Sequence, residues 1–266
     1  MLGAIVGDIV GSRFEGHNIK TKEFELFHHK CRPTDDTIMS LALAKAILES
    51  KTDYSDLGEL AVDNMQSLGR KYPHCGYGGN FKRWIFTMDP KPYHSFGNGS
   101  AMRVSAAGFV ANSLDEVKLL SRKITEVTHD HPEGLKGAEA TAGAVYMART
   151  GSSLQEIRDA IDRDYYPMNF TLDAIRPTYH FDVTCQGSVP QALMAFFEST
   201  GFEDAIRNAI SIGGDSDTIA AICGSVAEAY YGIPEKLRKH TLMFLDERLL
   251  KILTDFEKVY PPVRGK

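Results

Sequence analysis

Apolar residues recur at helical spacing along most of this chain, and two segments are apolar on nearly every side. In residues 38–48 only Ser40 and Lys45 interrupt the apolar run, and residues 219–229 are similarly apolar. A helix that is apolar all round is normally buried on all sides. Both segments are therefore predicted to be central helices.

Further segments show the helical period and extend the prediction over most of the chain. They are residues 57–69, 114–128, 137–148, 189–198, 202–212 and 237–259, the last as one or two helices. Ser113 and Glu116 predict a capping box. Long alternating β-branched runs are absent from the sequence, and no hairpin dipeptide lies between alternating runs. We therefore predict an all-α fold, with residues 1–266 as a single domain and residues 164–187 as a long excursion within it.

The first segment carries Gly3, Gly7 and Gly11 at intervals of four residues. On a helix these positions share one face and leave a groove with no side chains. The spacing predicts that another helix packs closely against this face in the core.

Charge, apolar stretches and cysteine spacing limit the functional classes to which the protein can belong. The chain of 266 residues has a net charge of −5 and no basic block, which argues against binding to nucleic acid, sequence-specific or not. No stretch approaches the roughly twenty apolar residues of a membrane span, and the apolar first ten residues lack the positive start of a signal peptide. The four cysteines form no C-x-x-C pair. Reduced thiols in a cytoplasmic protein are the simplest interpretation.

Two acidic motifs precede the two apolar helices. Residues 34–37 read Thr-Asp-Asp-Thr, and residues 215–218 read Asp-Ser-Asp-Thr. One such residue suffices to cap a helix N-terminus, so the surplus in both motifs favours ligation over capping. If the two helix starts meet, four carboxylates and up to three hydroxyls converge and repel unless a cation is bound. Hard divalent cations prefer such all-oxygen shells. The pattern predicts a metal centre with room for two ions.

Three polar segments lie between these motifs. Residues 76–81 and 96–103 are glycine-rich, and such loops bring backbone N–H groups close to phosphates or sugar hydroxyls. The alternative is that these glycines only end or start helices. Residues 128–132, Thr-His-Asp-His-Pro, are either a polar turn or supply one histidine that donates to a ligand oxygen. Zinc is excluded because no suitably spaced partners exist. Glu15 has in isolation the pattern of a solvated glutamate.

Taken in order, these motifs resemble the ADP-ribosylglycohydrolase family, which includes the dinitrogenase reductase-activating glycohydrolase and the ADP-ribosylarginine and ADP-ribosylserine hydrolases. The matching segments are Gly7-Asp8, residues 34–37, 76–78, 97–103, Thr128-His129 and residues 213–220. The resemblance implies a compact all-helical domain with two divalent ions, Mg²⁺ or Mn²⁺, in a central cleft.

By residue matching, the resemblance also implies a set of site residues. The metal ligands would be Thr34, Asp35, Asp36, Asp215, Asp217 and Thr218. Glu15 would lie near the scissile bond on a mobile segment. The ADP-ribose site would be lined by Gly78, Ser95, Gly97, Asn98 and His129, and the candidates for the adenine contact are Tyr77, Phe96 and Tyr179.

The implied activity is metal-dependent hydrolysis of the glycosidic bond in ADP-ribosylated proteins or small ADP-ribose conjugates, with Asp36 or Glu15 as the acid or base. Arginine-specific members tend to carry an acidic residue near positions 77–80, whereas this chain has Gly-Gly-Asn at 78–80, closer to the serine-specific type. The alternatives are hydrolysis of O-acetyl-ADP-ribose, a non-catalytic crystallin-like relative that binds ADP-ribose, and a metal phosphoesterase that releases AMP.

Overall fold

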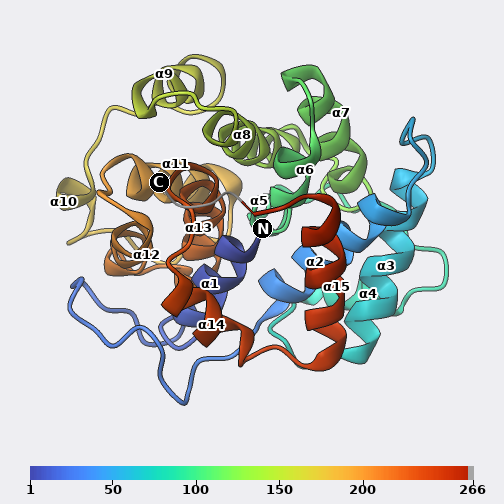
Figure 1. The fold of residues 1–266 in the computed structure, drawn as a ribbon, viewed down its shortest axis with the longest axis horizontal. Helices are drawn as coiled ribbons and strands as arrows, with labels where there is room; N and C mark the ends of the chain where they lie inside the picture. The colour runs from blue at the N-terminus through green and yellow to red at the C-terminus, as the bar shows by residue number, and fades with distance from the viewer. Residues whose placement is uncertain (263–266) are drawn as a thin grey trace.

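The computed structural model describes residues 1–262, and over that range the chain consists of helices and connecting loops (Figure 1). The helices are α1 (Leu2–Gly11), α2 (Asp35–Glu49), α3 (Leu57–Lys71), α4 (Gly79–Phe86), α5 (Gly99–Met102), α6 (Ser105–Val110), α7 (Leu114–Thr125), α8 (Pro132–Arg149), α9 (Leu154–Asp164), α10 (Leu172–Ile175), α11 (Cys185–Phe197), α12 (Phe202–Ser211), α13 (Ser216–Tyr231), α14 (Glu235–Leu242) and α15 (Glu247–Val259). Within these residues the strand-like pairing is one isolated bridge between Gly97 and Thr184. The predicted all-α fold is confirmed.

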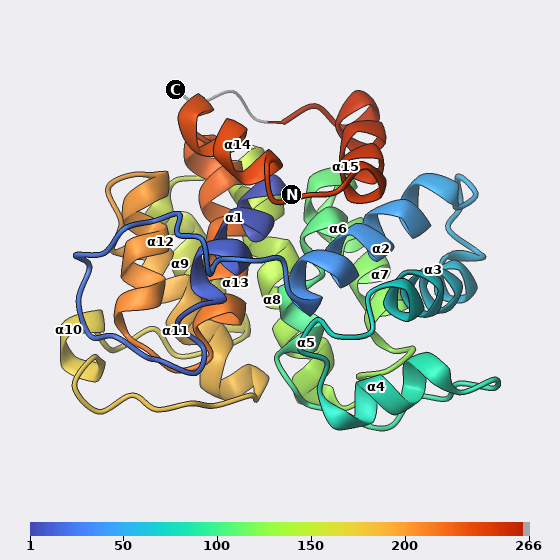
Figure 2. The same cartoon turned by 90° about the horizontal axis from the view of Figure 1, so that it is seen from below.

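Helices α1 and α13 form the centre of the molecule, although they come from opposite parts of the chain (Figures 1 and 2). The glycine face of α1 packs directly on the backbone of α13. A methyl group added at Gly7 would lie 2.0 Å from the Ala220 carbonyl oxygen, and one at Gly11 would lie 2.5 Å from the Asp217 Cα. The predicted close packing is confirmed, and its partner is the second apolar helix.

Helices α2 and α13, which the sequence predicted to be central, are buried along nearly their whole length. Helix α2 begins at Asp35 because the Thr34 hydroxyl accepts a hydrogen bond from the Asp36 N–H at 3.3 Å. Helix α13 begins at Ser216. Both helices thus start inside the acidic motifs, which places the carboxylates in their first turns. Apolar side chains from helices along the whole chain join in one core cluster.

Some boundaries differ from the predicted ones for identifiable reasons. Helix α8 starts at Pro132, because proline suits the first helical position and the His131 side chain caps the Glu133 N–H. At α7 only half of the predicted capping box forms, since the Glu116 carboxylate accepts from the Asn112 N–H. The segment 237–259 contains most of α14 and the whole of α15.

No helix in residues 1–262 combines the length and the apolar character needed to cross a membrane. Both glycine-rich segments lead into helices, α4 at Gly79 and α5 at Gly99. The 96–103 segment also pairs with residues before α11, because the Asn98 N–H donates to the Val183 carbonyl at 2.7 Å. This pairing fixes the loop against the start of α11.

Candidate metal centre and ligand cavity

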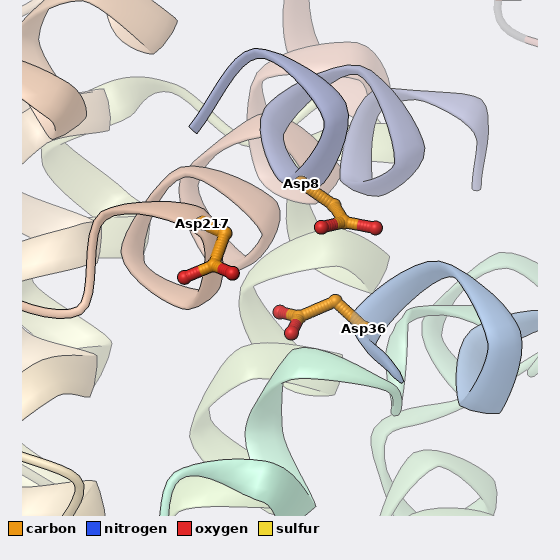
Figure 3. Close-up of side chains that lie close together, drawn as sticks. All are labelled: Asp8, Asp36 and Asp217. Carbon is orange, nitrogen blue, oxygen red and sulfur yellow. The ribbon is translucent and has the colours of Figure 1, made fainter. Parts of the chain in front are cut away.

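The two acidic helix starts meet. Asp8 of α1, Asp36 of α2 and Asp217 of α13 point toward one another (Figure 3), and one carboxylate oxygen from each lies within 4.8 Å of the others. Glu15, Asp215 and Asp217 form a second group with the same spacing. Because Asp217 belongs to both groups, the two form one continuous acidic cluster.

Asp8 is fully buried and accepts hydrogen bonds from the first acidic motif. Its Oδ2 accepts from the Thr34 N–H at 2.9 Å, from the Thr37 N–H at 3.0 Å and from the Thr37 hydroxyl, while its Oδ1 accepts from the Thr34 hydroxyl at 2.6 Å. Three of these four bonds end at Oδ2 and one at Oδ1, so both carboxylate oxygens accept from the motif. Asp8 therefore supports the turn that presents Asp35 and Asp36.

Asp36 has a buried carboxylate oxygen without a hydrogen-bond partner. Its Oδ2 is within hydrogen-bond distance of the Thr34 and Thr218 hydroxyls, at 3.4 and 3.3 Å, whereas its buried Oδ1 has no partner among the described residues. In residues 1–262 no carboxylate of the cluster forms an ion pair with a lysine, arginine or histidine. A buried unpaired carboxylate is costly without a cation. The oxygen-only donor set and the orphaned oxygen fit a hard divalent ion.

The pKa values of the cluster also favour a bound divalent cation. Burial raises the pKa of Asp8 and of Asp215 to about 6, and burial together with Asp8 raises the pKa of Asp35 to about 8. Burial, followed by the neighbouring carboxylates, raises the pKa of Asp36 and of Asp217 well above the ordinary value. A bound cation reverses these shifts because it favours the charged carboxylates.

A turn of two glycines precedes and orients the second acidic motif, residues 215–218. Gly213 and Gly214 have φ values of +71° and +77°, a region that favours glycine because it has no Cβ. The Asn18 side chain bonds both the N–H and the carbonyl of Gly214, at 2.8 and 2.9 Å. The buried Asn98 amide donates to the Asp215 carboxylate at 2.8 Å. The second motif is thus oriented by its own backbone turn and by two amide side chains.

The acidic cluster, apart from the fully buried Asp8, lines a cavity of 450 Å³. Of the site residues predicted from the sequence, these line it: Glu15, Asp35, Asp36, Gly78, Ser95, Gly97, Asn98, His129, Asp215, Asp217 and Thr218. Thr34 is buried beneath the surface, bonded to Asp8. The chain therefore brings the predicted residues together, while their individual roles stay predictions.

The aromatic candidates for an adenine contact lie elsewhere than expected. Tyr77, Phe96 and Tyr179 do not line the cavity in the described structure; its aromatic side chains are Phe81, Tyr93 and Phe181. Phe81 closes the first glycine-rich segment and lies in α4, whereas Tyr93 and Phe181 lie in irregular loops whose sequence carries no distinguishing signal.

Two buried polar residues were also missed as site residues. Asp8 is the only charged residue within the apolar helix α1, and that isolation was a usable signal. Arg103 closes the second glycine-rich motif and lines the cavity, although only 1% of it is exposed. Sequence alone gives an arginine no reason to be buried.

Comparison with known proteins agrees with this geometry. Residues 1–262 match the family model described as ADP-ribosylglycohydrolase. The human ADP-ribosylhydrolase ARH3 is 27% identical over 312 residues, which cover 88% of this chain and 85% of that protein. The ADP-ribosylarginine hydrolase Tri1 of Pseudomonas putida (strain GB-1) is 27% identical over 270 residues, covering 88% of this chain and 70% of that protein.

A solved structure described as an ADP-ribosylglycohydrolase-related protein complex has the same fold. Its TM-score is 0.71, its sequence is 24% identical, and the match covers 97% of this chain and 95% of that one. The family match, the relatives and the assembled cluster lead to one conclusion: this chain belongs to the ADP-ribosylglycohydrolase family and is a hydrolase of glycosidic bonds.

Proposed function

We propose that this protein, with two bound Mg²⁺ or Mn²⁺ ions, cleaves the glycosidic bond between ADP-ribose and an acceptor and releases free ADP-ribose. The acceptor is a side chain of a modified protein or a small conjugate. One observation carries the proposal: an unpaired acidic cluster and two glycine-rich loops line the same 450 Å³ cavity. A cavity of this size suits a small organic ligand.

The residues that would hold the ions are Thr34, Asp35, Asp36, Asp215, Asp217 and Thr218. Support comes from the orphaned Asp36 Oδ1 and from the absence of basic partners within the described chain. Bound there, divalent ions orient the ribose hydroxyls and lower the pKa of a water. Asp8 keeps its hydrogen bonds to residues 34–37 and so fixes the positions of Asp35 and Asp36.

Proton transfer falls to a carboxylate beside the ribose. Glu15 is partly exposed, lines the cavity and lies close to Asp215 and Asp217, so it can reach both the substrate and solvent. Asp36 is the alternative, but it is more deeply buried and we assign it to metal binding as well. Glu15 is therefore our leading candidate for the acid or base.

We also propose a cytoplasmic location, supported by the four free cysteines. The net charge of −5 and the acidic cavity support a substrate other than nucleic acid.

The test is release of ADP-ribose from arginine-, serine- and O-acetyl-linked substrates, each with Mg²⁺ or Mn²⁺. We expect intact ADP-ribose from at least one linkage and no release by Asp36→Ala. Asp63→Ala, at an exposed position on α3, is the matched control. Release of AMP would indicate a phosphoesterase instead. Binding of ADP-ribose without any turnover would indicate a non-catalytic relative.

Two conservative variants separate the proposed roles. Glu15→Gln should lower kcat strongly while metal affinity, measured by calorimetry, stays near wild type. Asp36→Asn should lower both, because it removes a ligand oxygen's charge. Full activity in Glu15→Gln would exclude it as the group that transfers the proton.

A further inference from the structure

A buried arginine without an acidic partner lies on the wall of the cavity. The Arg103 guanidinium packs over the Phe81 ring, 5.0 Å from its centroid, and its Nε has no hydrogen-bond partner among the described residues. Within residues 1–262, no Asp or Glu forms an ion pair with it. Burial lowers the pKa of Arg103 to about 10, so it stays charged at neutral pH. A buried charge needs a compensating partner.

The hydrogen bonds of Arg103 bear on which ring nitrogen of His129 carries the proton. Its Nη2 donates to the Thr128 hydroxyl at 2.6 Å and lies 3.3 Å from the His129 Nδ1. A guanidinium has only donors, so the nitrogen that it contacts must act as an acceptor. The Thr128 hydroxyl lies 2.7 Å from the same Nδ1 and can donate to it as well. The Thr128 hydroxyl is also 3.3 Å from the Thr125 carbonyl oxygen. The contact of Nδ1 with the Arg103 donor favours the tautomer in which the His129 proton is on Nε2.

The environment also keeps this imidazole neutral. Burial, helped by the positive charge of Arg103, holds the pKa of His129 well below its ordinary value. Nε2 lies toward the second glycine-rich loop: methyl groups added at Gly97 and Gly99 would be 3.6 and 3.5 Å from it. Both glycines and His129 line the cavity. The Nε2–H is thus a donor next to a stretch of backbone that leaves room for a ligand.

We propose that Arg103 is a positioning residue that fixes His129 as a neutral Nε2–H donor to a phosphate-type oxygen of the ligand bound over Gly97–Gly99. The ligand in this inference rests on the proposed function, in which the substrate carries a diphosphate. The Arg103 charge also offsets, for that diphosphate, the repulsion from the acidic cluster that lines the same cavity.

The tautomer is measured directly by nuclear magnetic resonance. In ¹⁵N-histidine-labelled protein, two-bond ¹H–¹⁵N correlations distinguish the two neutral tautomers and the cation, and His129→Gln identifies the His129 signals among the nine histidines. We expect the Nε2–H form in wild type and in Thr128→Val, which keeps the guanidinium contact. An Nδ1–H or charged imidazole in wild type would overturn the proposal, even if every Arg103 variant failed to fold.

Arg103→Met should release this constraint and give mixed tautomers or a charged imidazole. Arg149→Met is the control, because the Arg149 side chain is partly buried and donates to the Gly108 and Ala111 carbonyls outside the cavity. An unchanged Nε2–H form in Arg103→Met would show that Arg103 does not set the tautomer.

A double-mutant cycle tests whether Arg103 acts through His129. We expect Arg103→Met to weaken ADP-ribose binding about tenfold in wild type, by calorimetry with Mg²⁺ present. In the His129→Gln background the loss should be markedly smaller, because a glutamine amide donates without any tautomer to fix. Equal losses in both backgrounds would overturn the positioning role. If wild type bound no ADP-ribose, the proposed function and the ligand named here would fail, while the spectrum would still decide the tautomer.

Discussion

The helix start at residues 34–37 is held by a buried side chain of another helix, whereas the one at residues 215–218 is held by the backbone turn before it. Asp8 of α1 accepts four hydrogen bonds from the first motif. The second motif follows two glycines in the left-handed region and is steadied by Asn18 and Asn98. Two similar sequences thus reach the same cluster through different supports. The two motifs are alike in that both place carboxylates at the cavity wall.

Helix α1 connects the two supports, because it carries Asp8 and packs its glycine face on α13. The first prediction therefore concerns a substitution in α1 that should displace both acidic motifs. Gly7→Ala would place a methyl group 2.0 Å from the Ala220 carbonyl oxygen, which must push the helices apart. We expect a loss of about 3 kcal/mol in the free energy of unfolding, measured in urea, together with loss of activity.

The matched control for this change is Gly143→Ala in α8, where an added methyl group meets no atom within 4 Å. It should be neutral or stabilise the protein by about 0.5–1 kcal/mol, because alanine favours helices more than glycine does. Comparable losses from both variants would show that the α1–α13 contact has no special weight.

The second prediction separates the two supports. Asp8→Asn keeps the shape of the side chain but turns half of it into a donor, which then faces the donors of residues 34–37. Metal affinity should fall about 10- to 100-fold, the usual effect of losing a group that orients metal ligands. Isothermal calorimetry with Mn²⁺ measures it. Asp63→Asn, on the exposed side of α3, should bind Mn²⁺ as wild type does; equal affinity in Asp8→Asn would remove the support assigned to Asp8.

The third prediction concerns the charge that both motifs share. In metal-free protein, the raised pKa values of Asp8 and Asp215, about 6, and of Asp35, about 8, mean that the folded state holds protons which the unfolded state releases near pH 4. Stability is therefore fully present below about pH 4 and is lost as the pH rises to about 8. One pKa unit corresponds to about 1.4 kcal/mol and 1 kcal/mol to about 2 °C in a chain of this size, so the carboxylate contribution should lower Tm by on the order of 20 °C over that range.

Calorimetric scans with chelator, and then with Mg²⁺, check this prediction. The added ion should remove most of the decline, since it stabilises the charged carboxylates. To isolate the cluster from other titrating groups, the same scans are run on Asp36→Asn, where the decline should be smaller. A Tm that is independent of pH and of chelator would contradict a preformed binuclear site.

The smallest predicted effect falls on the second motif alone. Asn98→Ala removes the amide that lowers the pKa of Asp215, so this pKa should rise above about 6. Protons then compete better with the metal, and affinity should drop at pH 6.5 but little at pH 8. The stability cost should be about 1.5 kcal/mol. Asn112→Ala, at an exposed position, is the control, and an affinity loss that did not depend on pH would argue against this role.

The parts of this structure that were predictable depend on local pattern. Buried helices, close packing at Gly3, Gly7 and Gly11, and the meeting of the two acidic motifs all follow from spacing or from surplus polar residues. The helix start at Pro132 and the half-formed capping box at Ser113 depended on cap geometry, which a sequence pattern fixes only to within a few residues.

The unpredicted parts depend on contacts between distant residues. Asp8 had a usable signal as a lone charge in an apolar helix, but its partners at positions 34 and 37 follow only from the packing of α1 on α2. The burial of Arg103 and its contact with His129 had no local signal. The cavity aromatics Phe81, Tyr93 and Phe181 come from three separate loops or helices, so no single window of sequence indicates them.

The contact between α1 and α13 also bears on how the protein is made. Gly7 and Ala220 are about 210 residues apart, so the ribosome completes most of the chain before α1 can find its partner. Until then the apolar α1 lacks the helix on which it packs, and the acidic cluster lacks Asp215 and Asp217. Contacts of such long range slow folding and leave apolar surface exposed during synthesis. The active site should therefore be among the last parts to assemble, and a nascent chain that ends before α13 should bind no divalent ion at this site.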